Sequence, residues 1–159
     1  MPASDDITRR TRAVRAIIRV GTNASYQEVA NSTERAILTA AYGSLRSTGT
    51  SDWRHDALVD GERNVAALFG DLYLELSSGF GYRLRPGFMI GQFSTGAAAL
   101  VEGVAMREGV SDDLVGIQRP TGDDGELEDW TLYGIAFEGL FLTFFEPTGP
   151  DVFADLSRY

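Results

Sequence analysis

Residues 130–147 read WTLYGIAFEGLFLTFFEP, and the prediction of the fold starts from this stretch. Its apolar residues cover nearly every side of the helix that it would form, and residues 98–108, AALVEGVAMRE, follow a similar pattern. A helix that is apolar all round must be covered all round. The remainder of a 159-residue chain offers too few helices to surround two such segments. The sequence therefore predicts that the last two long helices meet those of a second subunit in a four-helix dimer interface.

Both segments place a glutamate and a glycine side by side, as Glu102-Gly103 and Glu138-Gly139. A glycine inside a helix costs about 1 kcal/mol relative to alanine. Close packing between helices would offset that cost, although the 18 glycines of the chain could also reflect its composition alone. The residues predicted to line the dimer interface are Ala99, Gly103, Gly134, Glu138, Gly139 and Leu142.

Neither glutamate has a basic residue three or four positions away in its helix. A buried carboxylate needs a partner, which must then come from another helix, another subunit, a backbone group or a ligand. The nearest basic candidates in the preceding loop are Arg83 and Arg85. The alternative is that each glutamate reaches solvent at the edge of the interface.

Apolar residues spaced three and four apart predict helices over residues 5–20, 26–46, 62–78, 89–108 and 130–146. They also predict a short helical segment at Trp53. Residues 109–129 are rich in acidic side chains and are predicted to form a solvated loop. No run alternates with a period of two. The expectation is one domain spanning residues 1–159, an all-α bundle of about six helices.

Composition and charge narrow the functional classes. The chain has no cysteine, which excludes disulfides and thiol chemistry, and no catalytic or phosphate-binding motif; its one histidine, His55, lies in a polar segment. We therefore expect no enzyme activity, metal or cofactor. The net charge is -9, with five arginines gathered in the basic helix at residues 1–20, which is either a solvated face or a contact for nucleic acid or a partner.

The N-terminus and the longest apolar run bear on where the protein is located in the cell. The N-terminus lacks the apolar core of a signal peptide. The longest apolar stretch has 16 residues and includes Glu138, whereas a membrane span needs roughly 20. The expectation is a cytoplasmic protein without membrane contact.

Six aromatic side chains fall where helices of a bundle would enclose an apolar cavity. Such cavities bind small molecules when a few polar groups fix the orientation of the ligand, and tyrosine and tryptophan can supply those groups. A plain core is the alternative. The candidate ligand-binding residues are Phe69, Tyr73, Phe93, Trp130, Tyr133 and Phe137.

Two segments, 60–108 and 130–147, resemble the C-terminal half of TetR-type transcriptional regulators. The resemblance is carried by LRPG at residues 84–87, by ALVEGVAMR at 99–107, and by the apolar segment at 130–147. It implies an all-helical effector-binding and dimerisation domain whose last two long helices form the dimer interface. The effector would be a small, largely apolar molecule.

The N-terminal helix-turn-helix of that family has no counterpart in residues 24–42, ASYQEVANSTERAILTAAY. DNA contact is expected only through such a missing head, so the sequence is either the effector half of a longer regulator or a natural form without the head. The leading hypothesis is a ligand-sensing, homodimerising domain of a regulator. The alternative is a stand-alone helical protein that dimerises or binds a small molecule and has no role on DNA.

Overall fold

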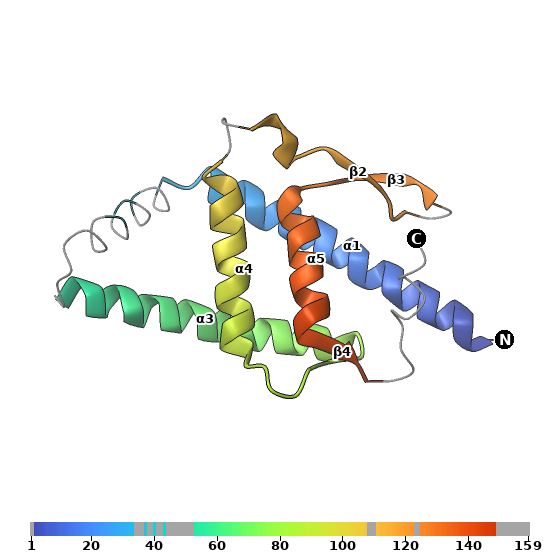
Figure 1. Ribbon diagram of the computed structural model, residues 1–159. Helices are drawn as coiled ribbons and strands as arrows, with labels where there is room; N and C mark the ends of the chain where they lie inside the picture. The colour runs from blue at the N-terminus through green and yellow to red at the C-terminus, as the bar shows by residue number, and fades with distance from the viewer. Residues whose placement is uncertain are drawn as a thin grey trace.

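The computed structural model describes residues 2–33, 53–107, 111–122 and 125–148, together with the isolated positions 37, 40 and 43 (Figure 1). The elements in chain order are the helices α1 (Pro2–Ala30) and α3 (Trp53–Gly79), strand β1 (Tyr82–Leu84), helix α4 (Ile90–Ala105), the short 3-10 turn η1 (Asp112–Leu114), strands β2 (Ile117–Pro120) and β3 (Leu127–Trp130), helix α5 (Leu132–Phe144) and strand β4 (Phe145–Pro147).

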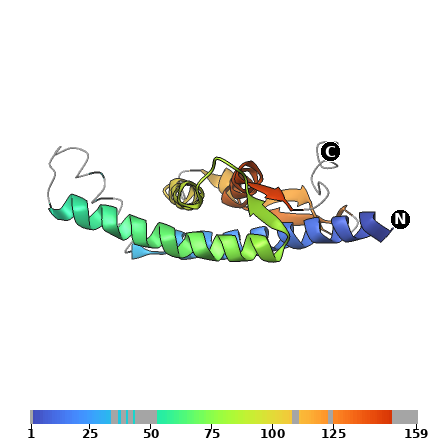
Figure 2. The ribbon, with the colours of Figure 1, turned by 90° about the horizontal axis from the view of Figure 1, so that it is seen from below.

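The helices form two layers. α4 and α5 run side by side in opposite directions across α1 and α3 (Figure 1), and the view from below shows them together on one side of α1 and α3 (Figure 2). α1 packs against both α4 and α5, whereas α3 packs against α4. One face of the α4–α5 pair is therefore covered by helices of the same chain.

The prediction of an all-α bundle of about six helices is wrong. In the part of the chain that the structure describes, four α-helices are joined by two antiparallel two-stranded sheets. β1 pairs with β4 in the register Leu84 to Phe145, and β2 pairs with β3 in the register Arg119 to Glu128. The first sheet links the approach to α4 with the end of α5.

The segment predicted as a solvated acidic loop, 109–129, contains the β2–β3 hairpin. Ile117, Arg119, Glu128 and Trp130 are the less exposed members of each strand, in alternation with exposed neighbours. Gly125 has φ 83°, a left-handed conformation that glycine adopts without strain and that suits the turn. This alternation was not predicted, because two of the inward-facing residues, Arg119 and Glu128, are charged.

The first helix is longer than predicted. A break was expected at residues 21–25, but α1 continues through them to Ala30. Thr22 and Tyr26 extend the buried stripe of Val14 and Ile18 at four-residue spacing, and the Thr22 hydroxyl donates to the Ile18 carbonyl at 2.6 Å. The predicted helix at 26–46 thus begins inside α1, and most of its remainder lies outside the described residues.

The last helix is shorter than predicted at both ends. The Thr131 hydroxyl accepts a hydrogen bond from the backbone N–H of Gly134 at 3.0 Å, which makes Thr131 the N-cap and leaves Trp130 in β3. At the other end Phe145 enters β4. α3, in contrast, is longer than predicted, because the short segment at Trp53 and the predicted helix 62–78 form one continuous helix.

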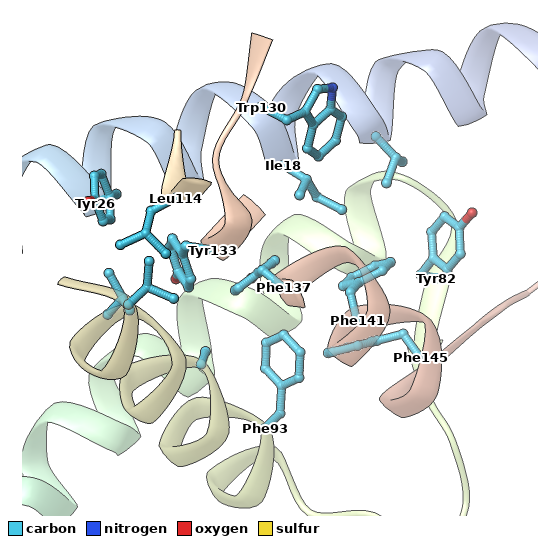
Figure 3. Close-up of a cluster of buried hydrophobic side chains, with 14 residues drawn as sticks. Ile18, Tyr26, Tyr82, Phe93, Leu114, Trp130, Tyr133, Phe137, Phe141 and Phe145 are labelled. Carbon is cyan, nitrogen blue, oxygen red and sulfur yellow. The ribbon is translucent and has the colours of Figure 1, made fainter. Parts of the chain in front are cut away.

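The core lies between α1, α4 and α5. Phe93 of α4 is fully buried, and its ring contacts Phe137, Phe141 and Phe145 with centroids 5.0–6.4 Å apart. Figure 3 shows these rings lying between α4 and Ile18 of α1. Among the described residues, none of the helices has the length and hydropathy that crossing a membrane would need.

Candidate functional site

Glu138 finds its partners on α1 and on the hairpin. Its Oε1 accepts from Arg15 Nε at 2.9 Å and its Oε2 from Arg119 Nη1 at 2.6 Å. The Glu138 side chain is only 8% exposed, so the carboxylate is held inside the fold and does not reach solvent. The candidates proposed from sequence proximity, Arg83 and Arg85, instead pair with Glu146 of β4.

A second ion pair continues this group. Arg19 Nη2 lies 2.7 Å from Glu128 Oε1, while Glu128 Oε2 accepts a hydrogen bond from the Thr121 hydroxyl at 2.7 Å. We call Arg15, Arg19, Arg119, Glu128 and Glu138 the arginine–glutamate cluster. Two arginines of the basic first helix, Arg15 and Arg19, therefore form ion pairs within the chain.

Trp130 forms the floor of the arginine–glutamate cluster. The guanidinium carbon of Arg119 lies 4.6 Å from the centre of the Trp130 ring, a cation–π contact. The indole Nε1 donates to the Thr121 hydroxyl at 2.8 Å. These two contacts lie within the hairpin, whereas the pairs Arg119–Glu138 and Arg19–Glu128 attach it to α5 and α1.

Five of the six predicted ligand-binding residues come together as an aromatic cluster, which we define as Phe69, Tyr73, Phe93, Tyr133 and Phe137. Ring centroids of neighbouring members lie 5.0–6.1 Å apart. The sixth residue, Trp130, instead packs against Arg119 of the arginine–glutamate cluster. The aromatic rings contact one another directly, mostly edge to face, as in a packed core.

The polar part of the aromatic cluster is a pair of tyrosine hydroxyls. Burial raises the pKa of Tyr73, and burial together with the neighbouring Tyr73 raises the pKa of Tyr133, which a hydrogen bond with Ser25 partly opposes. Both hydroxyls are therefore protonated at neutral pH. Each can donate a hydrogen bond to an uncharged acceptor.

The aromatic cluster is exposed to solvent on the α3 side, at Phe69. Phe69 is 44% exposed and stacks on Tyr73, whose ring in turn contacts Phe93 and Phe137. Phe93, Tyr133 and Phe137 are buried. A ligand that entered here would first meet the ring of Phe69.

The side of α4 and α5 that faces away from α1 and α3 carries few charges, although exposed Arg107 donates to the Gly103 carbonyl and half-buried Glu102 lies beside Gly103. The two helices contain 29 residues, and their only charged members are Glu102 and Glu138. We define the outer face by its exposed residues and their half-buried neighbours: Gln92, Thr95, Ala99, Gly103 and Met106 on or next to α4, and Leu132, Ile135, Ala136, Gly139, Leu142 and Thr143 on α5.

The predicted dimer-interface residues divide between two sides of these helices. Ala99, Gly103, Gly139 and Leu142 lie on the outer face. Gly134 and Glu138 are buried against α1 of the same chain, where a Cβ on Gly134 would lie 2.9 Å from Thr22 Oγ1. Within the described part of the chain, a Cβ on Gly139 would meet no atom within 4 Å outside its own helix backbone. Gly134 thus serves close packing inside the chain, and Gly139 has no such role there.

A shallow depression of about 340 Å³ lies between α1 and the hairpin, with Asn23, Gln27, Asp129 and Thr131 in its wall. The Thr131 hydroxyl donates to Asn23 Oδ1 at 3.2 Å across it. Its wall shares no residue with the aromatic cluster. The depression is therefore separate from the aromatic cluster, although Trp130, the sixth predicted ligand-binding residue, also lines it.

Comparisons with known proteins give no relative. No protein-family model matches the chain, and no curated protein and no solved structure is significantly similar to it.

Proposed function

We propose that this chain is a homodimerisation and effector-sensing module of the kind that TetR-type transcriptional regulators carry in their C-terminal half. The observation that supports it best is the outer face of α4 and α5, where small and uncharged residues replace the charged ones expected on an exposed helix. α4 and α5 of one copy pack on α4 and α5 of the other.

Charge favours a second copy as the occupant of the outer face. Each chain has a net charge of -9, so two copies repel each other when acidic surfaces meet. The outer face carries fewer charges than the rest of the surface, so two copies meet there about a two-fold axis with less repulsion. Ala99 and Gly139 lack bulky side chains, which lets the helix backbones come close.

Replacing Gly139 by leucine is expected to weaken the dimer by at least about tenfold, or about 1.4 kcal/mol. The added side chain has open space within one chain, so the fold of the subunit is kept, while it separates the backbones of two packed copies. Sedimentation equilibrium across a concentration series measures the change. Gly61→Leu is the matched control, because Gly61 also lies within a helix with open space beside it. Equal dissociation constants for the two variants would count against the outer face as the interface.

The exposed side of the aromatic cluster supports the effector part of the proposal. The effector is a small, neutral, largely apolar molecule that inserts beside Phe69 and accepts a hydrogen bond from Tyr73 or Tyr133. The negative field of the chain disfavours anions. A stand-alone dimeric protein without a role on DNA would use the same outer face. Binding of a ligand at the aromatic cluster would distinguish the sensing function from dimerisation alone.

The neutral dye N-phenyl-1-naphthylamine tests this site. Its fluorescence is expected to rise on binding, and Phe69→Ala should weaken that binding by about tenfold, because a half-buried aromatic contact is lost. Phe88→Ala is the control, since Phe88 is a comparably exposed aromatic residue outside the cluster. Identical titration curves for the two variants would show that the dye does not use the aromatic cluster.

A further inference from the structure

Helix α3 exposes an apolar stripe along three helical turns. Its members share spacings of three and four residues and form what we call the α3 stripe: Val65, Leu68, Phe69, Leu72 and Leu76. Leu68 is 71% exposed. Another face of the same helix packs against α4, where a Cβ on Gly70 would lie 3.3 Å from Ile90 Cγ1 and 3.4 Å from Ser94 Oγ. Contiguous exposed apolar residues on a polar-rimmed surface mark an interaction site.

Carboxylates border the α3 stripe. Asp71 and Glu75 lie along one side and Glu62 along the other, and all three are exposed. Helix α3 carries five acidic residues against two arginines, one of which, Arg63, pairs with Asp60 at 3.3 Å. The rim of the stripe is therefore negative.

We infer that the α3 stripe is the docking surface for an amphipathic, basic helix of a partner protein. Residues spaced as i, i+3, i+4 and i+7 are the anchors through which a helix lies against an apolar face. Asp71 and Glu75 attract lysine or arginine at the flanks of that helix. A second copy presenting its own α3 would bring carboxylates against carboxylates, so charge selects a basic partner over self-association here.

The partner occupies the opposite layer from the outer face. The outer face belongs to α4 and α5, whereas α3 lies in the other layer, as the view from below shows (Figure 2). The two contacts can therefore form together. Phe69 belongs both to the α3 stripe and to the aromatic cluster, so the docked helix covers the exposed side of that cluster.

A designed peptide tests the inference with the full-length chain. The probe is a fluorescein-labelled helix of 18 residues, about five turns, with leucines at i, i+3, i+4, i+7 and i+11 and lysines at its flanks. Fluorescence anisotropy is expected to give a dissociation constant of about 1–50 μM. A peptide of the same composition, in which the leucines no longer share a face, is expected to bind at least tenfold more weakly. Equal binding of the two peptides, or no binding of the first, would overturn the inference.

Variants assign the binding to the α3 stripe. Leu68→Gln/Leu72→Gln is expected to weaken peptide binding at least tenfold, whereas the matched control Val115→Gln/Leu127→Gln, at exposed positions elsewhere, leaves it unchanged. Asp71→Asn/Glu75→Gln is expected to weaken binding severalfold and to reduce its salt dependence. Two results contradict the inference: equal binding by both leucine variants, or a fall in the molar mass of the protein alone on Leu68→Gln/Leu72→Gln, which would make a second copy the occupant.

Discussion

Replacing Glu138 by glutamine is expected to lower the free energy of unfolding by about 3 kcal/mol, within the range for breaking a buried ion pair. The Glu138 carboxylate is 8% exposed and accepts from both Arg15 and Arg119. The amide of glutamine has one acceptor oxygen and no charge, so two guanidinium groups would lose their common counter-ion. The hairpin should also loosen, because Arg119 is one of its main attachments to the body.

Urea denaturation measures this effect, with Glu126→Gln as the control because Glu126 is an exposed residue of the same hairpin. The difference between the two variants should persist in 1 M salt, since buried pairs are screened much less than exposed ones. A loss below about 1 kcal/mol, the size found for surface pairs, would mean that the arginine–glutamate cluster does not hold the fold together.

Replacing Gly134 by valine is expected to cost about 3 kcal/mol, at the upper end for overpacking a core. A Cβ at this position would lie 2.9 Å from Thr22 Oγ1 and 3.3 Å from both Thr131 Oγ1 and Trp130 Cε3. Thr22 cannot easily move aside, because its hydroxyl is bonded to the Ile18 carbonyl. α1 and α5 would have to separate, which disturbs the contact between them along the whole helix.

Thermal and urea unfolding of Gly134→Val provide the measurement. Gly61→Val is the control, because it makes the same change within a helix where open space surrounds the new side chain. The control should be neutral or slightly stabilising, since valine favours helix more than glycine does. Similar stabilities for the two variants would show that α1 and α5 do not approach as closely as the structure has them.

The sequence predicted those parts of the fold in which inward residues are apolar. Phe69, Tyr73, Phe93 and Phe137 were expected on helices around an apolar cavity or in a plain core, and their rings are in direct contact. The β2–β3 hairpin was not predicted, because the charged residues Arg119 and Glu128 occupy inward positions. A search for apolar alternation treats such residues as solvated, whereas here their charges are neutralised by partners on other elements.

Long-range contacts account for the other errors. Arg15 and Arg119 lie 123 and 19 positions from Glu138, so no local pattern could pair them with it. The predicted start of a new helix at residue 26 followed from Asn23 and Ser25, residue types that favour helix N-caps. Tertiary burial of Thr22 and Tyr26 against the rest of the protein overrides that preference.

The two apolar helices are partly covered within the chain itself. α4 and α5 were predicted to be too apolar for one chain to cover. The structure shows that α1 and α3 of the same chain cover one side of them and bury Phe93, Phe137 and Phe141. What remains for a second copy is the outer face, whose residues are mostly small.

The molar mass in solution tests the proposed dimer most directly. Multi-angle light scattering across a concentration series, in physiological salt, is expected to give twice the chain mass of 17.3 kDa at the upper end, falling toward the single-chain mass on dilution. A mass of 17.3 kDa that persists up to hundreds of micromolar protein would contradict the proposal, because the outer face would then remain exposed in the isolated chain.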